Sequence, residues 1–179
     1  MKLIIASDIH GSLTAAQALA QAVERHQPDR LLLMGDLLYQ GPRNVTPADY
    51  DPGQVIPLLN SLKDIVLAVR GNCDSEVDQM VLSFPITADF AWLVTEKATL
   101  FATHGHVYDP DTWPLRPGEY FVSGHTHVAG RHEAAGHICL NPGSMGIPKG
   151  GTPAGYMTFD GSAFRWHHLS GEVYDTLEV

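Results

Sequence analysis

The stretch YFVSGHTH, residues 120–127, runs from strand-forming residues into a glycine and then to two histidines, His125 and His127. In an extended backbone, residues two apart point the same way, so we expect both imidazoles on one side, about 6–7 Å apart. Neutral imidazole is the commonest metal-binding side chain near neutral pH. The pair alone is weak evidence, because a chain with 10 histidines in 179 residues contains such pairs by chance.

Three earlier apolar runs also end in polar residues, and each reads as a strand buried on both faces. These runs are residues 3–6, 30–34 and 65–69. A helix is predicted over residues 15–25, and a shorter helix up to about residue 63 follows an irregular loop over residues 39–57. The order strand, helix, strand indicates a parallel α/β unit. In open α/β sheets, ligands bind at the carboxyl ends of the strands.

From about residue 90 the pattern changes to short strand candidates at short spacing. They are residues 90–94, 98–102, 121–123, 128–132, 137–140, 155–159, 163–168 and 172–174. Such a pattern favours a second sheet that is mixed or antiparallel. The predicted fold class is α/β: a two-sheet α/β/β/α sandwich with a helix layer outside each sheet. The length fits a single domain over residues 1–179.

The acidic composition limits the classes of partner. A net charge of −9 argues against an extended nucleic-acid surface but permits a small phosphate substrate at a locally positive site. The two cysteines, Cys73 and Cys139, are too few for a disulfide framework and fit a reducing compartment. The apolar start is too short for a signal peptide or a membrane span. We therefore expect a cytoplasmic protein without membrane attachment, and a homo-oligomer remains open.

Residues of the types that bind metals follow five of the predicted strands. Ordinary turns do not explain this recurrence. The seven candidates are Asp8, His10, Asp36, Asn72, His104, His125 and His127. A single catalytic ion usually has three or four protein ligands, so this set favours two ions with a bridging carboxylate. Imidazole and carboxylate ligands suit Mn, Fe, Zn or Ni, and we expect Mn²⁺. Two divalent ions, two carboxylates and a hydroxide would leave a net charge of about +1, which attracts a phosphate ester anion.

The order of these residues resembles the five-block signature of the calcineurin-like metallophosphoesterases. The blocks are Asp8-x-His10, Gly35-Asp36, Gly71-Asn72-x-Asp74, His104 and Gly124-His125-x-His127. The stretch NPGS at residues 141–144 is similar to the YfcE-like bacterial phosphodiesterase subgroup. The resemblance implies a two-sheet sandwich that hydrolyses small phosphodiesters with two divalent metal ions.

The resemblance also implies a role for each ligand. One ion would be held by Asp8, His10, Asp36 and His127, and the other by Asp36, Asn72, His104 and His125. Asp36 would then bridge the two ions. A hydroxide between the ions would attack phosphorus in line, so no serine or cysteine nucleophile is required.

Cys73 is the one departure from the family pattern. Many members have a histidine at this position, which is thought to protonate or stabilise the leaving oxygen, and Asp74 would orient that residue. The catalytic candidates are therefore Asp36, Asn72, Cys73, Asp74 and His104. We expect a small direct role for Cys73 at most, and its effect on substrate scope is open.

Several other polar residues carry no distinctive pattern. His106 is predicted either to contact the substrate phosphate or to support the metal ligands. Arg43 and Asn44 lie in the long loop and could meet a substrate, but a solvated loop is the preferred interpretation. Lys149 precedes two glycines but lacks the pattern of a nucleotide-binding loop.

Two alternative functions are compatible with the same motifs. A phosphomonoesterase or protein phosphatase usually needs additional positive groups for a dianionic phosphate, and few arginines lie near these motifs. A non-catalytic scaffold is the second alternative, because a small subunit of the retromer coat resembles this fold. The filled ligand positions weigh against the scaffold.

Overall fold

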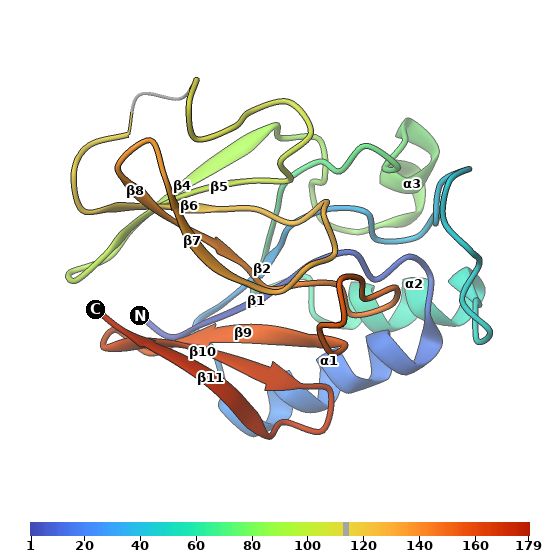
Figure 1. Ribbon diagram of the computed structural model, residues 1–179. Helices are drawn as coiled ribbons and strands as arrows, with labels where there is room; N and C mark the ends of the chain where they lie inside the picture. The colour runs from blue at the N-terminus through green and yellow to red at the C-terminus, as the bar shows by residue number, and fades with distance from the viewer. Residues whose placement is uncertain (113–114) are drawn as a thin grey trace.

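Two β-sheets pack face to face in the computed structural model, which describes residues 1–112 and 115–179 (Figure 1). The strands of the first sheet, in spatial order, are β11 (Val173–Glu178), β10 (Ala163–His168), β9 (Gly155–Phe159), β1 (Leu3–Ala6), β2 (Arg30–Leu33) and β3 (Val66–Ala68). β1 pairs in parallel with β2 and antiparallel with β9, so strands from both ends of the chain meet at the centre of this sheet.

The second sheet is mixed, as its sequence pattern predicts. Its strands, in spatial order, are β4 (Phe90–Val94), β5 (Thr99–Thr103), β6 (Glu119–Val122), β8 (His137–Asn141) and β7 (Gly130–Ala134). β5, β6 and β8 are parallel, whereas the two edge strands are antiparallel to their neighbours. The predicted two-sheet fold class is confirmed.

Two helices cover the outer face of the six-stranded sheet (Figure 1). α1 (Leu13–His26) begins where the Ser12 hydroxyl accepts a hydrogen bond from the backbone N–H of Ala15. α2 (Pro52–Ser61) packs against α1, and its Asp51 carboxylate accepts from the N–H of Gln54. A third helix, α3 (Glu76–Val81), was not predicted, because six residues are too few to show a period.

The loop predicted through residue 57 ends earlier than expected. α2 starts at Pro52 and contains Pro57. A proline is tolerated in the first turn of a helix, and Asp51 caps that turn. Val55 and Leu59 are one turn apart and buried, so packing against α1 holds the helix despite Pro57.

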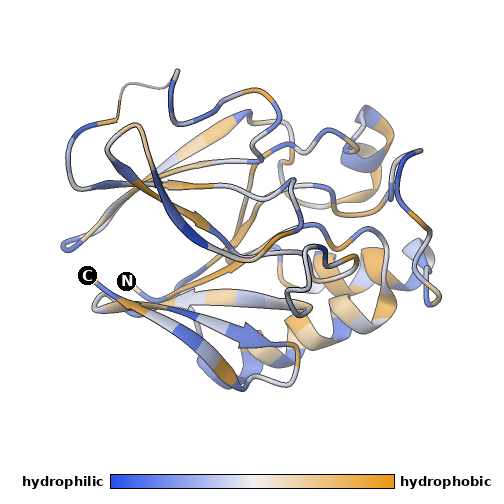
Figure 2. Ribbon diagram, in the orientation of Figure 1, coloured by the Kyte–Doolittle hydropathy of each residue, from blue (hydrophilic) through white to orange (hydrophobic). Residues whose placement is uncertain are grey.

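Alternating residues of β1 build two separate cores. Ile4 and Ala6 face the helices, while Leu3 and Ile5 face the second sheet. Figure 2 shows hydrophobic residues concentrated along the central strands and the helices. The buried Trp166 crosses between the sheets, because its indole N–H donates to the carbonyl of Asn141 over 2.8 Å.

The outer face of the five-stranded sheet differs from the prediction. Phe101, Phe121 and Cys139 form a small core there, and Tyr108 and Leu115 from the loop before β6 pack on it. Across residues 1–112 and 115–179, the three helices lie elsewhere, so a loop replaces the helix layer expected outside this sheet.

No helix within the described residues is both long and apolar enough to cross a lipid bilayer.

The carboxyl ends of β2 and β3 are tied together by the buried Asp74. Its carboxylate accepts hydrogen bonds from the backbone N–H groups of Asp36 (2.9 Å), Leu37 (2.9 Å) and Gly71 (2.7 Å). The two turns also touch directly, because a Cβ on Gly71 would lie 2.1 Å from Oδ1 of Asp36. Asp74 and Gly71 therefore fix the position of Asp36.

Substitution Asp74→Asn should lower the free energy of unfolding by about 2–4 kcal/mol. The amide has one acceptor oxygen, and its NH₂ group would face backbone donors. Chemical denaturation of the metal-free protein measures the effect. Asp64→Asn removes the same charge at an exposed position and should change stability by no more than about 0.5 kcal/mol. Equal stability of the two variants would contradict the role of Asp74.

Candidate metal centre

Left-handed backbone conformations aim most of the predicted ligands into one site at the strand ends. Positive φ angles occur at Asp8 (55°), His10 (50°), Asp36 (56°), His125 (65°) and His127 (62°). These are five of the seven non-glycine residues with positive φ in the described part of the chain. Such conformations are uncommon outside glycine and persist where the surrounding structure enforces them, often at functional sites.

Asp8 is fully buried and held from one side only. Its Oδ2 accepts from the Ser7 hydroxyl over 2.5 Å and from the backbone N–H of His125 over 3.1 Å. A Cβ on Gly124 would lie 2.0 Å from the Ser7 Oγ, so glycine is needed at that position. The other oxygen, Oδ1, is buried without a hydrogen-bond partner and faces the site.

Backbone carbonyls fix the tautomers of three histidines. Nδ1 of His10 lies 2.8 Å from the carbonyl oxygen of Tyr39, and His104 and His127 make the corresponding contacts, both at 2.6 Å, with Met34 and Ile147. A carbonyl can only accept, so each Nδ1 carries the proton. In a neutral ring, Nε2 then presents its lone pair to the site, as in metal-binding histidines.

Three of these inward-facing atoms crowd together. Nε2 of His10 lies 3.2 Å from Nε2 of His127, and Oδ1 of Asp8 lies 3.5 Å from the former and 3.3 Å from the latter. Neutral rings with these tautomers place three acceptors side by side and no donor between them. A divalent cation at this point would satisfy all three, so Asp8, His10 and His127 fit a metal ion.

Asp36 connects this group to a second one. Its Oδ2 lies 3.7 Å from Nε2 of His10, and its Oδ1 lies 3.6 Å from Nε2 of His104. Nε2 of His104 is also 3.1 Å from Oδ1 of Asn72. The half-buried His125 completes this side, with its ring centroid 5.1 Å from that of His104. The structure thus brings all seven predicted ligands together.

The pKa shifts of Asp8 and His125 favour the forms in which these two side chains can bind a metal ion, a carboxylate and a neutral imidazole. Burial acts to raise the pKa of Asp8, but the adjacent imidazoles of His10 and His127 outweigh burial and hold that pKa well below its usual range. Burial acts to lower the pKa of His10, but the contact with Asp8 outweighs it and the pKa rises. Burial, together with the neighbouring His104, lowers the pKa of His125.

Cys73 lies beside the bridging position without the partner that was predicted for it. Its backbone N–H donates to Oδ1 of Asp36 over 2.8 Å, and its Sγ accepts from the Asn72 amide over 3.2 Å. Burial and the Asp36 carboxylate raise the pKa of the thiol to about 12, which disfavours a nucleophilic role. The Asp74 carboxylate binds the three backbone groups described above, so its orienting role, predicted for a histidine at position 73, has no counterpart for the Cys73 thiol.

The NPGS stretch at residues 141–144 supports the ligand turns. The Asn141 amide donates to the carbonyl of Gly124 over 2.8 Å, beside His125. The Ser144 hydroxyl donates to the carbonyl of Asp8 over 2.7 Å. Residues far apart in the sequence therefore hold the left-handed turns that present the ligands.

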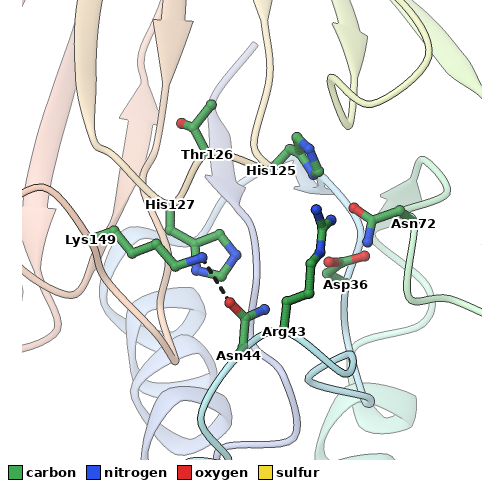
Figure 3. Close-up of a pocket in the computed structure, with 8 residues that line it drawn as sticks. All are labelled: Asp36, Arg43, Asn44, Asn72, His125, Thr126, His127 and Lys149. Atoms are coloured by element: carbon green, nitrogen blue, oxygen red, sulfur yellow. Dashed lines mark hydrogen bonds between the residues drawn. The ribbon is translucent and has the colours of Figure 1, made fainter.

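The site opens into a cavity of about 360 Å³ (Figure 3). It is lined by Asp36, Arg43, Asn44, Asn72, His125, Thr126, His127 and Lys149. Arg43 and Asn44 thus line the cavity, where a solvated loop was the preferred of two interpretations, and no role in the site was predicted for Lys149. These residues lie in irregular loops that carry no periodic signal. The exposed His106 lies at the edge, with its ring centroid 5.3 Å from that of His104.

Comparison with known proteins gives consistent matches. The family model of the calcineurin-like phosphoesterase superfamily domain matches residues 1–163. Phosphodiesterase YfcE of Escherichia coli (strain K12) is 47% identical over 161 residues, which is 89% of this chain and 88% of the relative. The solved structure of Yfce, a phosphoesterase from E. coli, superposes with a TM-score of 0.93 at 42% identity and covers 99% of both chains. Vacuolar Protein Sorting 29 from Cryptosporidium parvum shares the fold, with a TM-score of 0.64 at 16% identity over 99% of this chain and 98% of its own.

Adding Mn²⁺ to metal-free protein should raise Tm by about 5–10 °C at roughly 100 times the dissociation constant. The ion would bind the acceptor atoms of Asp8, His10 and His127 and remove the electrostatic repulsion among them. Thermal unfolding after dialysis against chelator measures the shift. Asp8→Asn should remove most of it, whereas His132→Ala, at an exposed position on β7, should keep it. An equal shift in all three proteins would place the bound metal elsewhere.

Proposed function

Because the chain belongs to the calcineurin-like phosphoesterase superfamily, we propose that it is a metal-dependent hydrolase that cleaves phosphodiester bonds. The observation that carries the proposal is the convergence of Oδ1 of Asp8 with Nε2 of His10 and His127, which fits a metal ion. The 47% identity to a bacterial phosphodiesterase over 89% of the chain supports the diester as the bond that is cleaved.

We assign two ions to the site. The first would be held by Asp8, His10, Asp36 and His127, and the second by Asp36, Asn72, His104 and His125. The two oxygens of Asp36 face His10 and His104 on different sides, which supports Asp36 as the bridge. Mn²⁺ is our first choice, with Fe, Zn or Ni as alternatives for the same donor set. When bound, such a pair would supply a hydroxide nucleophile and would stabilise charge on the phosphoryl group.

The chain's own residues prepare the site before substrate arrives. The carbonyls of Met34, Tyr39 and Ile147 hold the imidazole rings in place, so little reorganisation is needed on binding. The N–H of Cys73 holds Oδ1 of Asp36. Asn72 and His125 line the cavity as well as belonging to the ligand set, so the reacting phosphate would meet the second group of ligands directly.

Phosphomonoester hydrolysis is the second candidate, and one observation favours it. Arg43 and Lys149 bring positive charge to the cavity, which could accommodate a dianionic phosphate. A non-catalytic scaffold is not favoured, because every ligand position is filled and preorganised. We also propose a small phosphodiester as substrate and a cytoplasmic location, which the two free cysteines support.

Hydrolysis of bis(4-nitrophenyl) phosphate tests the function and the bridge. Chelation should abolish turnover, and Mn²⁺ should restore it. Asp36→Asn should lower turnover by about 10²–10³-fold or more and reduce bound metal. The substitution replaces one oxygen of the proposed bridging carboxylate by an NH₂ group and removes its negative charge. His10→Ala and Cys73→Ala should be less severe. Full activity in chelator, or two bound ions in Asp36→Asn, would count against the mechanism.

Substitution Cys73→His should change leaving-group preference. A nitrophenolate leaves with little protonation, whereas a ribose oxygen needs a proton, and general acid catalysis is typically worth about 10²–10⁴-fold. The thiol is a poor acid at neutral pH, because its pKa is raised to about 12 by burial and by Asp36. We therefore expect a gain on 2′,3′-cyclic nucleotides relative to nitrophenyl diesters, measured as the ratio of turnover numbers. If the ratio is unchanged while the metal content is intact, position 73 does not determine the leaving-group preference.

A further inference from the structure

Two cationic side chains line the cavity without a carboxylate partner. Arg70, Arg131 and Arg165 each form an ion pair on the surface. Among the described residues, no ion pair involves Arg43 or Lys149, and the same holds for other surface cations such as Lys63 and Lys97. What distinguishes Arg43 and Lys149 is that both line one cavity, in a chain with a net charge of −9.

The two cations come from different loops that line the cavity, and a hydrogen bond joins these loops. Lys149 follows β8, and its backbone N–H donates to the carbonyl of His127 over 3.0 Å. Its Nζ donates to Oδ1 of Asn44 over 2.8 Å, and the Asn44 amide donates to the carbonyl of Gln40 over 2.8 Å. Figure 3 shows the Arg43 side chain extending toward Asp36 and Asn72, with Lys149 at the other side of Asn44.

The charge of the cavity exceeds what a simple diester requires. Two divalent ions, the carboxylates of Asp8 and Asp36 and a hydroxide leave about one positive charge, which a diester monoanion neutralises. Arg43 and Lys149 add two further positive charges to the same cavity. Its volume of about 360 Å³ is in the range of small-molecule sites and leaves room beyond one phosphate.

We propose that Arg43 and Lys149 form a subsite for a second anionic group, a phosphate or carboxylate, on one of the two groups esterified to the reacting phosphate. The guanidinium of Arg43 offers bidentate hydrogen bonds to such a group, and the ammonium of Lys149 offers a point charge that Asn44 positions. The subsite rests on the proposed function and specifies its substrate class: diesters that carry an additional anion.

A pair of matched substrates tests the subsite. The 4-nitrophenyl ester of thymidine 5′-phosphate, with or without a 3′-phosphate, has the same scissile bond and leaving group and differs by one anionic group. With Mn²⁺-loaded protein we expect kcat/KM to be at least about tenfold higher for the 3′-phosphorylated ester, mainly through a lower KM. A 3′-O-succinyl ester shows whether a carboxylate serves as well as a phosphate.

Substitutions connect this preference to the two cations. Arg43→Gln and Lys149→Met should each reduce the ratio of kcat/KM between the two esters, and together they should bring it close to one. Lys97→Met removes a charge at the exposed β4–β5 turn, remote from the cavity, and should leave the ratio unchanged. Calorimetry gives a readout independent of turnover: thymidine 3′,5′-bisphosphate should bind at least about tenfold more tightly than thymidine 5′-phosphate, and the double variant should lose this difference.

The outcomes separate the subsite from the function itself. Equal kcat/KM for the two esters, or a ratio that survives both substitutions, overturns the subsite. If 4-nitrophenyl phosphate is instead the substrate whose hydrolysis depends on Arg43 and Lys149, the cations serve the reacting phosphate and the subsite is again overturned. Failure to hydrolyse any diester in the presence of metal overturns the proposed function.

Discussion

Electrostatic repulsion among inward-facing acceptor atoms is the constraint on which the rest of this structure depends. Oδ1 of Asp8 and Nε2 of His10 and His127 lie within 3.5 Å of one another in a buried site. The fold holds them there through left-handed turns and through donors such as the hydroxyl of Ser144, which bind the backbone behind the ligands. A site assembled in this way is complementary to a cation before any cation arrives.

The sequence predicts which polar residues meet at the site because strands and their ends carry a local signal. A buried strand is a continuous apolar run, and a polar ligand directly after it marks the carboxyl edge of the sheet, as at Asp8 and Asp36. The rim of the cavity carries no such signal. Lys149 reaches it only because its backbone bonds to His127, a contact between loops that no periodicity reveals. The loop that packs on Phe101 was not predicted for a similar reason, because this loop supplies the apolar side chains that were expected from a helix.

The architecture separates the reactive groups from the groups that select a substrate. The ligands follow β1, β2, β3, β5 and β6, so the two packed sheets determine their positions. The side chains of Arg43 and Lys149 lie on loops, which can change in sequence without disturbing either core. Variation of these loops would therefore alter what enters the cavity while the metal site stays the same, as expected when one fold serves several functions.

The central position of β1 has a consequence for how the chain acquires its structure. Leu3 lies opposite Arg30 on one side and Phe159 on the other, so β1 pairs with β9, a strand that is synthesised much later. Until residue 159 has left the ribosome, one edge of an apolar strand stays unpaired and exposed to aggregation. Such distant pairing also slows folding. The donors of Ser144 and Gly146 to the Asp8 carbonyl are also synthesised long after Asp8, so the turn that presents this carboxylate lacks them until then.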